Sequence, residues 1–497
     1  MTFKTLPDHR PTTFPARVTA WVHRHPGWGA WLVLVVLFSS YLFGSDPVNI
    51  PHDAEQYWQL AEEYWASGEF RFLAFDNELR GYLFPLLLSG LVWVLQHVAL
   101  TPLDLTRAMG AGTAALLFGV VMPGLWQALQ PAGSPSVPLG RRLLLGALGF
   151  VFWCGYFNFP LSDFPAVLAL ASGLWAAARS RSVGGGLLAG LCVAAAANFR
   201  PVYAVTLPLV LLLSLWPQPA EPAPPQWRGW LRGLALVAGM ALVMAPQMSI
   251  NQAHFGVRSP FVLTNLPGKP SLYLDQLYWG LLYQKYETSV GTDYPTPRMI
   301  FTDAEGEQLW NESGLATLTT YAQYGHIAQL APLTVTTVWL GHLFNGLDLQ
   351  YSTPYITRVY TLTWGFAWFN YSVLLGGLWV LVGRVRRRPW RSYVPVALVL
   401  GALLGPCLAT LPVAMECRFL LPLHLILSAG FAFGGQPLAI WRRNDLRQRL
   451  AGLALYATVI VSCFLLSTNT QLTLEKAPRY VFKWQQPETV TPKAVTW

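Results

Sequence analysis

Long apolar runs separated by short charged clusters extend along most of the chain. The runs are about 16–24 residues long, and about 20 residues at a rise of 1.5 Å per residue cross about 30 Å of hydrocarbon. The pattern therefore predicts an all-α polytopic membrane protein with about 11 full spans. We place these spans at residues 28–44, 105–129, 143–159, 163–178, 184–199, 201–216, 231–250, 361–383, 393–412, 419–440 and 450–467.

The charged clusters between the runs predict the topology. Basic residues concentrate on the cytoplasmic side of membrane proteins, and arginines gather at 141–142, 179–181, 228–232, 384–391 and 442–449. With these clusters and the N-terminus inside, the first loop and the C-terminal tail lie outside. With this topology, two more apolar stretches, 81–99 and 327–347, cannot each cross the membrane once without placing a flanking segment on the wrong side. We expect both to lie in the interface or to dip in and return, and counting them gives 13 segments.

Composition argues against the common soluble classes. Of the 497 residues, 53% are hydrophobic and 11% are charged, whereas a soluble domain carries about 25% charged residues. A soluble enzyme, a disulfide scaffold, a disordered chain and a nucleic-acid binder therefore all fit poorly. The five cysteines show no CxxC or Cys/His metal spacing.

The first external loop, 46–80, holds eight of the 24 acidic residues. From Tyr57 onward, apolar residues recur at i, i+3, i+4, i+7 and i+8, which predicts an amphipathic helix at the membrane interface. Asp53 opens this helix, and Gln56 follows three residues later. Asp53 is therefore either the N-cap of a helix in a near capping box or a general base at the membrane surface.

Three further motifs place charged residues in turns on the same external side. They are Pro160-Leu-Ser-Asp163-Phe-Pro165, Asn198-Phe-Arg200-Pro201 and Glu416-Cys-Arg418-Phe-Leu-Leu-Pro422. A guanidinium group matches a phosphate with two parallel hydrogen bonds, which makes the two arginines candidates for a lipid phosphate. The alternatives are a turn cap for the aspartate, snorkelling to head groups for Arg200, and simple pairing of Arg418 with Glu416.

Taken in order, these motifs resemble the GT-C superfamily of membrane glycosyltransferases. The resemblance is to the branch of protein O-mannosyltransferases and lipid A aminoarabinose transferases, glycosyltransferase family 39. It includes Asp53-Ala-Glu55-Gln-Tyr57 in the first loop, Arg80-Gly-Tyr-Leu-Phe-Pro85 before an apolar stretch, and Arg107 at the next span. It implies a GT-C-like fold with external juxtamembrane helices and an external cap.

The resemblance also implies an inverting glycosyltransferase. Such an enzyme moves a sugar from a polyprenyl-phosphate donor to a lipid, glycan or protein acceptor, with Asp53 as general base. We assign the second acidic or acceptor site to Glu55 and Asp163, and the donor phosphate to Arg200, Arg418, Lys269 and Lys285. The remaining candidates for the substrate cavity are His52, Tyr57, Arg80, Tyr82 and Glu416. We expect no metal or other cofactor, with a divalent cation as the alternative because several carboxylates can bind a hard cation.

The chain divides into four regions by these patterns. Residues 1–250 form a transmembrane glycosyltransferase module, 251–360 a long aromatic-rich external loop or cap, 361–467 the C-terminal transmembrane helices, and 468–497 an external tail. We expect short helices in the cap, as at 309–322. The expected location is a bacterial inner membrane, with membrane lipids and the lipid-linked donor as partners and no nucleic acid. The rival functions are a flippase or transporter of lipid-linked sugars and an oligosaccharide ligase or polymerase.

Overall fold

The computed structural model describes residues 21–475, except residue 23 and the segments 46–48, 67–71, 132, 181, 217–225, 266–270, 291–296, 358–362, 386–392 and 436–444. Lys269, most of the arginine cluster 384–391 and the tail beyond residue 475 therefore lie outside the described residues.

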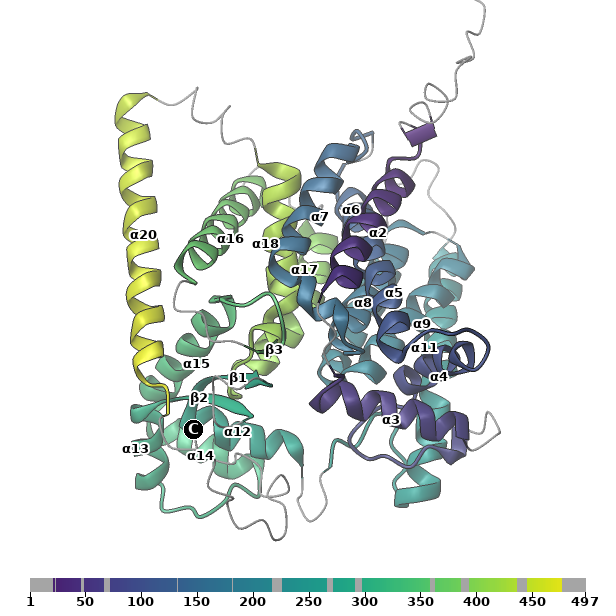
Figure 1. Cartoon of the computed structure of the whole chain (residues 1–497), viewed down its shortest axis with the longest axis horizontal. Coiled ribbons are helices and arrows are strands. Elements are labelled where there is room, and N and C mark those ends of the chain that lie inside the picture. The colour runs from purple at the N-terminus through teal and green to yellow at the C-terminus, as the bar shows by residue number, and fades with distance from the viewer. Residues whose placement is uncertain are drawn as a thin grey trace, which may run out of the picture.

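Helices that run roughly side by side form most of the described chain (Figure 1). The first half contains α2 (Pro26–Gly44), α3 (His52–Ala66), η1 (Phe72–Ala74), α4 (Leu83–Leu95), α5 (Pro102–Leu116), η2 (Leu117–Val121), α6 (Met122–Ala128), α7 (Leu139–Trp153), η3 (Cys154–Asn158), α8 (Asp163–Arg179), α9 (Val183–Phe199), η4 (Pro201–Thr206), α10 (Leu207–Leu215) and α11 (Gln226–Phe255). The second half contains α12 (Leu272–Leu282), α13 (Ala304–Glu312), α14 (Tyr321–Leu330), α15 (Pro332–Leu347), α16 (Trp364–Val385), α17 (Tyr393–Thr410), η6 (Cys417–Leu420), α18 (Leu421–Gly434) and α20 (Leu446–Leu472), with strands β1 (Tyr283–Ser289), β2 (Arg298–Thr302) and β3 (Tyr355–Ile356).

The multi-pass membrane architecture is confirmed, since each of the 11 predicted spans is mostly helical where it is described. By length and apolarity, however, seven helices in the described part of the chain suffice to cross a membrane, or eight if the pair α14–α15 is one span. The other four predicted spans are shorter helices: α7, α8, α9 and α10 have 15, 17, 17 and 9 residues. Two of them are shortened by 3₁₀ segments, because η3 replaces the end of α7 and η4, which begins at a proline, replaces the start of α10.

The two doubtful segments avoid a simple straight crossing. Helix α4 has 13 residues, which cover about 20 Å and fall short of the hydrocarbon thickness. Helices α14 and α15 meet at a bend of 108°. The bend lies where Pro332 begins α15, because proline suits a first helical turn but cannot continue the preceding helix.

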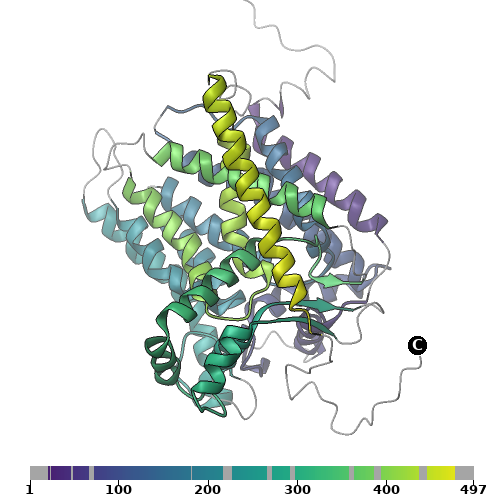
Figure 2. The same cartoon turned by 90° about the vertical axis from the view of Figure 1, so that its left-hand side faces the viewer.

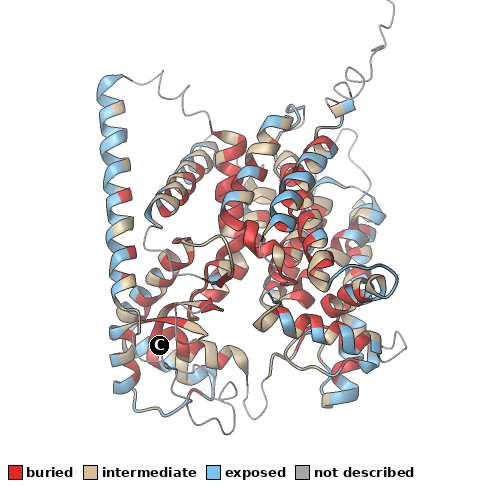
Figure 3. Ribbon diagram, viewed as in Figure 1, coloured by how far each residue is buried: buried red, intermediate tan, exposed pale blue. Residues whose placement is uncertain are grey.

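The core of the bundle is closely packed. Figure 3 shows buried residues along the inner faces of the helices and exposed residues along their outer faces. Helices α9 and α11 approach at backbone distance, since a Cβ added to Gly190 would lie 1.9 Å from the carbonyl oxygen of Leu236. Small residues allow this approach between membrane helices.

The predicted amphipathic helix is α3, and its apolar stripe faces the protein. Ala54, Tyr57, Trp58, Ala61 and Tyr64 are buried, at the i, i+3, i+4, i+7 and i+10 positions of one face. The helix packs against α4, and in Figure 1 it lies at one end of the bundle, across the ends of other helices.

At the same end lies the segment 272–356, here called the cap (Figure 1). It contains a three-stranded sheet in the order β2-β1-β3, in which β1 is antiparallel to β2 and parallel to β3. The sequence analysis did not predict this sheet. The expected short helices of the cap are present as α12, α13 and α14, but the bounds 309–322 are wrong. Gly314 has a left-handed φ of 66° just after α13, and α14 begins only after the Thr320 cap.

The last helix, α20, lies along the outside of the bundle (Figure 2). Only 11% of its apolar window is buried, and Figure 3 shows it as largely exposed. Its C-terminal end nevertheless joins the cap: Thr302 N–H donates to Thr473 and Glu475 N–H donates to Ile300. The described start of the predicted tail therefore packs on β2.

Candidate functional site

A polar cavity of about 510 Å³ lies between the cap, α3 and the ends of several bundle helices. Its walls come from the start of α8, the α9–η4 junction, the end of α17, η6, α12 and the sheet. The charged residues that line it are Asp53, Arg80, Asp163, Arg200, Arg298 and Arg418. The cavity therefore brings together both predicted aspartates and both predicted arginines from four separate parts of the sequence.

Asp53 lies in the first turn of α3, and its carboxylate contacts two arginines. Arg80 Nη2 donates to Oδ1 at 2.8 Å, and Arg418 Nη2 lies 3.3 Å from Oδ2. The predicted capping box does not form, because the Gln56 side chain also accepts a hydrogen bond from Arg80, at 3.1 Å. Both residues of the predicted box thus bind an arginine instead of the helix terminus.

Arg418 contacts three carboxylates at once. Its Nε donates to Glu416, its Nη2 contacts Asp53, and its Nη1 lies 3.6 Å from Asp163. The predicted alternative that Arg418 pairs with Glu416 is correct, but this pair is one part of a larger cluster.

Asp163 and Arg200 form a further ion pair in the same cluster. The Asp163 side chain is only 3% exposed, and it binds arginine side chains instead of capping its own turn. Arg200 ends α9, and its guanidinium lies 5.4 Å from the centre of the Phe419 ring. Three carboxylates thus alternate with three guanidinium groups: Asp53 and Asp163 line the cavity, and Glu416 supports Arg418 from behind.

Arg80 is held in place by the backbone around Gly81. A Cβ at Gly81 would lie 2.0 Å from the carbonyl oxygen of Asn198, so the two chain segments touch. The Asn198 side chain accepts the N–H of Leu83 at 2.9 Å and donates to Gln247 at 2.9 Å. The start of α4, the end of α9 and the middle of α11 therefore fix Arg80 beside Asp53.

The electrostatics of Asp53 follow from these neighbours. Burial alone would raise the pKa of the carboxyl group, but the charges of Arg80, Arg418 and Arg298 outweigh burial and hold the pKa below its ordinary value. Asp53 is therefore ionised at neutral pH.

The cap supplies the opposite wall of the cavity. Tyr273 and Gln276 come from α12, Tyr286 from β1 and Arg298 from β2, with the Arg298 guanidinium 5.1 Å from the Tyr286 ring. The Tyr273 hydroxyl donates to the Ala409 carbonyl at 2.7 Å, which ties α12 to α17.

Several lining residues were not among the sequence candidates, for example Thr264 and Gln276. Thr264 has a left-handed φ of 57°, which is strained for a β-branched residue and which no local sequence signal revealed. Tyr57, a predicted cavity residue, lines the cavity and bonds to Ser162 at 3.0 Å.

Several other predicted site residues do not line the polar cavity. Lys285 is buried and bonds to Glu287 at 2.9 Å, which corrects its assignment to the donor phosphate. Glu55 is exposed and accepts a hydrogen bond from Gln59, so it is not part of the acidic site. Tyr82 is buried, with its hydroxyl donating to Val243.

His52 lies just outside the cavity, at the start of α3. Its φ is +51°, and its ring lies 5.9 Å from that of Tyr355, whose hydroxyl accepts the N–H of Ala54. Burial, together with the charge of Arg298, lowers the pKa of His52. Glu416, although it contacts Arg418, is itself 7% exposed and lies behind the cavity wall.

Among the described residues, no group of three or more His, Cys, Asp or Glu side chains is arranged to hold a metal ion. The carboxylates at the cavity face guanidinium groups instead. The cluster is thus better suited to binding an anion between arginines than a cation between acids.

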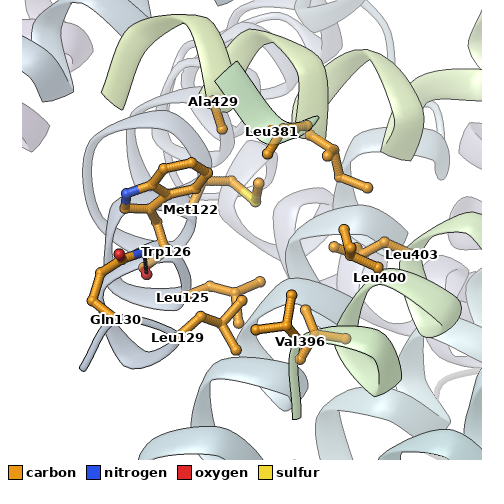
Figure 4. A pocket seen from close by; sticks show the side chains of 12 residues that line it. Met122, Leu125, Trp126, Leu129, Gln130, Leu381, Val396, Leu400, Leu403 and Ala429 are labelled. Atoms are coloured by element: carbon orange, nitrogen blue, oxygen red, sulfur yellow. Dashed lines mark hydrogen bonds between the residues drawn. The ribbon is translucent and has the colours of Figure 1, made fainter. Parts of the chain in front are cut away.

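A second cavity, of about 90 Å³, lies between α6, α16, α17 and α18 (Figure 4). Its 12 lining residues are uncharged, and Figure 4 shows aliphatic side chains around most of it, with Trp126 and Gln130 on one side. This apolar cavity offers no acid, base or cation for chemistry, so the polar cavity is the candidate site.

In comparisons with protein-family models, curated proteins and solved structures, no match to this chain was found.

Proposed function

We propose that this protein is an inverting glycosyltransferase that uses a sugar linked through phosphate to a polyprenyl lipid. The observation that carries the proposal is the contact of an ionised aspartate, Asp53, with Arg80 and Arg418 at the wall of one cavity. A transfer of this kind needs a base for the acceptor and cations for the leaving phosphate, both within reach of the same bond.

The proposed reaction is a single displacement. The acceptor hydroxyl oxygen attacks the anomeric carbon, and the bond from that carbon to the phosphate oxygen breaks. The electron pair of that bond leaves with the phosphate, whose growing charge is stabilised by Arg418 and Arg200. The hydroxyl proton passes to the Asp53 carboxylate. Attack opposite to the leaving group inverts the anomeric configuration.

The position of the cavity supports a lipid-borne substrate. Its lining continues from the arginines to the apolar side chains of Val202, Val205 and Val413 at the ends of η4 and α17. Val205 is 45% exposed, so the cavity presents an apolar surface that a hydrocarbon chain could contact. We place this end of the bundle on the external face of the membrane, as the distribution of arginine clusters predicts.

The test is sugar transfer from a panel of polyprenyl-phosphate sugars by membranes that contain the protein. Asp53→Asn should lower the rate by about 100-fold or more, the scale of a lost general base. Glu63→Gln, on the exposed face of the same helix, is the matched control and should retain full activity. Equal activity of Asp53→Asn and wild type would exclude Asp53 as the base. Movement of lipid-linked sugar between leaflets without transfer would establish a flippase instead.

A further inference from the structure

The carboxylates at the polar cavity occupy the positions around the arginines that a phosphate would need. Arg418 offers its nitrogens to three carboxylates, those of Glu416, Asp53 and Asp163. A phosphate group carries the same charge sign and presents oxygens with similar spacing to a guanidinium group. In the structure, therefore, the protein's own carboxylates occupy the anion-binding site that the arginines form.

The three contacts of Arg418 are not equally tight. Glu416 is the closest partner and is only 7% exposed. Asp53 and Asp163 lie at 3.3 and 3.6 Å, longer than the usual 2.7–2.9 Å of a charged hydrogen bond. Each of these two aspartates also has a closer arginine elsewhere, Arg80 for Asp53 and Arg200 for Asp163. The Nη atoms of Arg418 are therefore the donors most easily withdrawn from their present partners.

We propose that the phosphate of the lipid-linked substrate and the carboxylates of Asp53 and Asp163 compete for Arg418, so that phosphate binding releases Asp53 to act as a base. This inference rests on the proposed function, since it concerns the same site. Arg418 would then exchange its carboxylate partners for the substrate phosphate. The reaction would be ordered: the donor binds first, and the acceptor loses its proton only afterwards.

The release also explains how so strongly paired an aspartate acts as a base. Arg80, Arg418 and Arg298 hold the pKa of Asp53 low, and its ionisable neighbours among the described residues include His52 and Tyr355. When a phosphate neutralises Arg418, one of the charges that depress this pKa is cancelled, and the carboxylate becomes a stronger base.

The experiment measures the binding of farnesyl phosphate, by isothermal titration calorimetry, to purified protein in nanodiscs. This probe carries the head group that transfer would leave behind, and farnesol is the control for binding through the hydrocarbon chain alone. Asp53→Asn should bind farnesyl phosphate roughly threefold to tenfold more tightly than wild type, because one competing carboxylate is gone. Asp163→Asn should also bind more tightly, and Glu63→Gln should match wild type.

A double-mutant cycle locates the competition. Arg418→Gln should weaken binding by about tenfold or more, and in that background Asp53→Asn should give a smaller gain. The melting temperature of each preparation checks that the variant is folded. If Arg418→Gln unfolds, the comparison of Asp163→Asn with wild type still tests the proposal.

Weaker or unchanged binding by both folded Asp→Asn variants would overturn the exchange, even if transfer is observed. Tighter binding without any transfer activity would keep the exchange and refute the transferase. A failure of every variant to bind farnesyl phosphate would overturn both.

Discussion

Arg80 Nη2 donates to Oδ1 of Asp53 at 2.8 Å, across 27 positions of sequence that include nearly all of α3. The side-chain contact is partly buried, with exposed fractions of 19% for Arg80 and 34% for Asp53. The pair explains why Asp53 does not cap its helix: the carboxylate gains a charged partner outside the helix, and Gln56 turns to the same guanidinium. Several predictions depend on this geometry.

The first concerns the pH dependence of transfer. Because the pKa of Asp53 is held below its ordinary value of about 3.9, the free enzyme keeps this base ionised at every pH above about 5. We expect kcat/KM, which reports the free enzyme, to show no loss from Asp53 between pH 5 and 7. His52, whose pKa is lowered by burial and by Arg298, should add no limb at its usual pKa near 6.5.

The variant Arg80→Gln tests whether Arg80 lowers the pKa of Asp53. The variant removes the strongest charge that lowers the pKa of Asp53, so the acidic fall of kcat/KM should begin at a higher pH than in wild type. The ion pair's contribution to folding follows the same rule: it is present above the unfolded pKa and is lost as pH falls through the lower folded value. An acidic limb at the same pH in both proteins would contradict this assignment.

The second prediction tests the backbone contact that places Arg80. In Gly81→Ala, the new methyl group would lie 2.0 Å from the Asn198 carbonyl oxygen, so one segment must move. We expect a loss of about 1–3 kcal/mol in unfolding free energy, as for other overpacked sites, and a fall in transfer activity as Arg80 shifts. Gly90→Ala, on α4 with open space around it, is the control and should be neutral or slightly stabilising. Thermal unfolding in detergent and the transfer assay measure both effects.

The sequence predicts the helices and the side of the bundle on which the charged motifs meet, because both follow from apolar periodicity and arginine placement. It does not predict which charges pair. The contact of Asp53 with Arg418 joins positions 365 residues apart, and no local pattern encodes it.

The sheet in the cap also could not be predicted from local sequence patterns. Strand β1 takes its partners from Arg298–Thr302 and Tyr355–Ile356, the latter more than 60 residues away. From the sequence, Lys285 on β1 is predicted to be an external cation that binds phosphate, but in the structure it is buried.

The third prediction follows from that burial. Lys285→Met should cost about 3–5 kcal/mol, because it leaves the Glu287 carboxylate, whose side chain is only 13% exposed, without its charged partner. The pKa of Glu287, already raised by burial, should rise further. The double variant Lys285→Met with Glu287→Met removes both charges and should recover most of the stability.

The same double variant tests the role of Lys285 in the site. Because Lys285 does not line the polar cavity, the folded double variant should keep the KM for the lipid-linked donor of the wild type. A large increase in that KM would indicate that Lys285 binds the donor phosphate after all.

The last prediction concerns α20, which packs on α16 through an apolar cluster around Ile460 and joins the bundle through polar side chains near its end. The Asp348 carboxyl group is fully buried and accepts hydrogen bonds from Tyr371 at 2.5 Å, Ser467 at 2.8 Å and Gln350 at 2.9 Å. Asp348→Ala leaves the buried hydroxyl groups of Tyr371 and Ser467 without this acceptor, whereas Gln350 keeps its bond to Ser467. We expect a loss of roughly 2 kcal/mol or more. Ser372→Ala removes a hydroxyl that bonds to Tyr456 of α20 and to the Trp368 carbonyl within α16, and it should cost about 1 kcal/mol. Since residues 473–475 bond to β2, a detached α20 should loosen the cap and lower transfer as well. Limited proteolysis and thermal unfolding of the two variants measure the effect. Equal stability of Asp348→Ala and wild type would show that the apolar contacts with α16 hold α20 without the Asp348 hydrogen bonds.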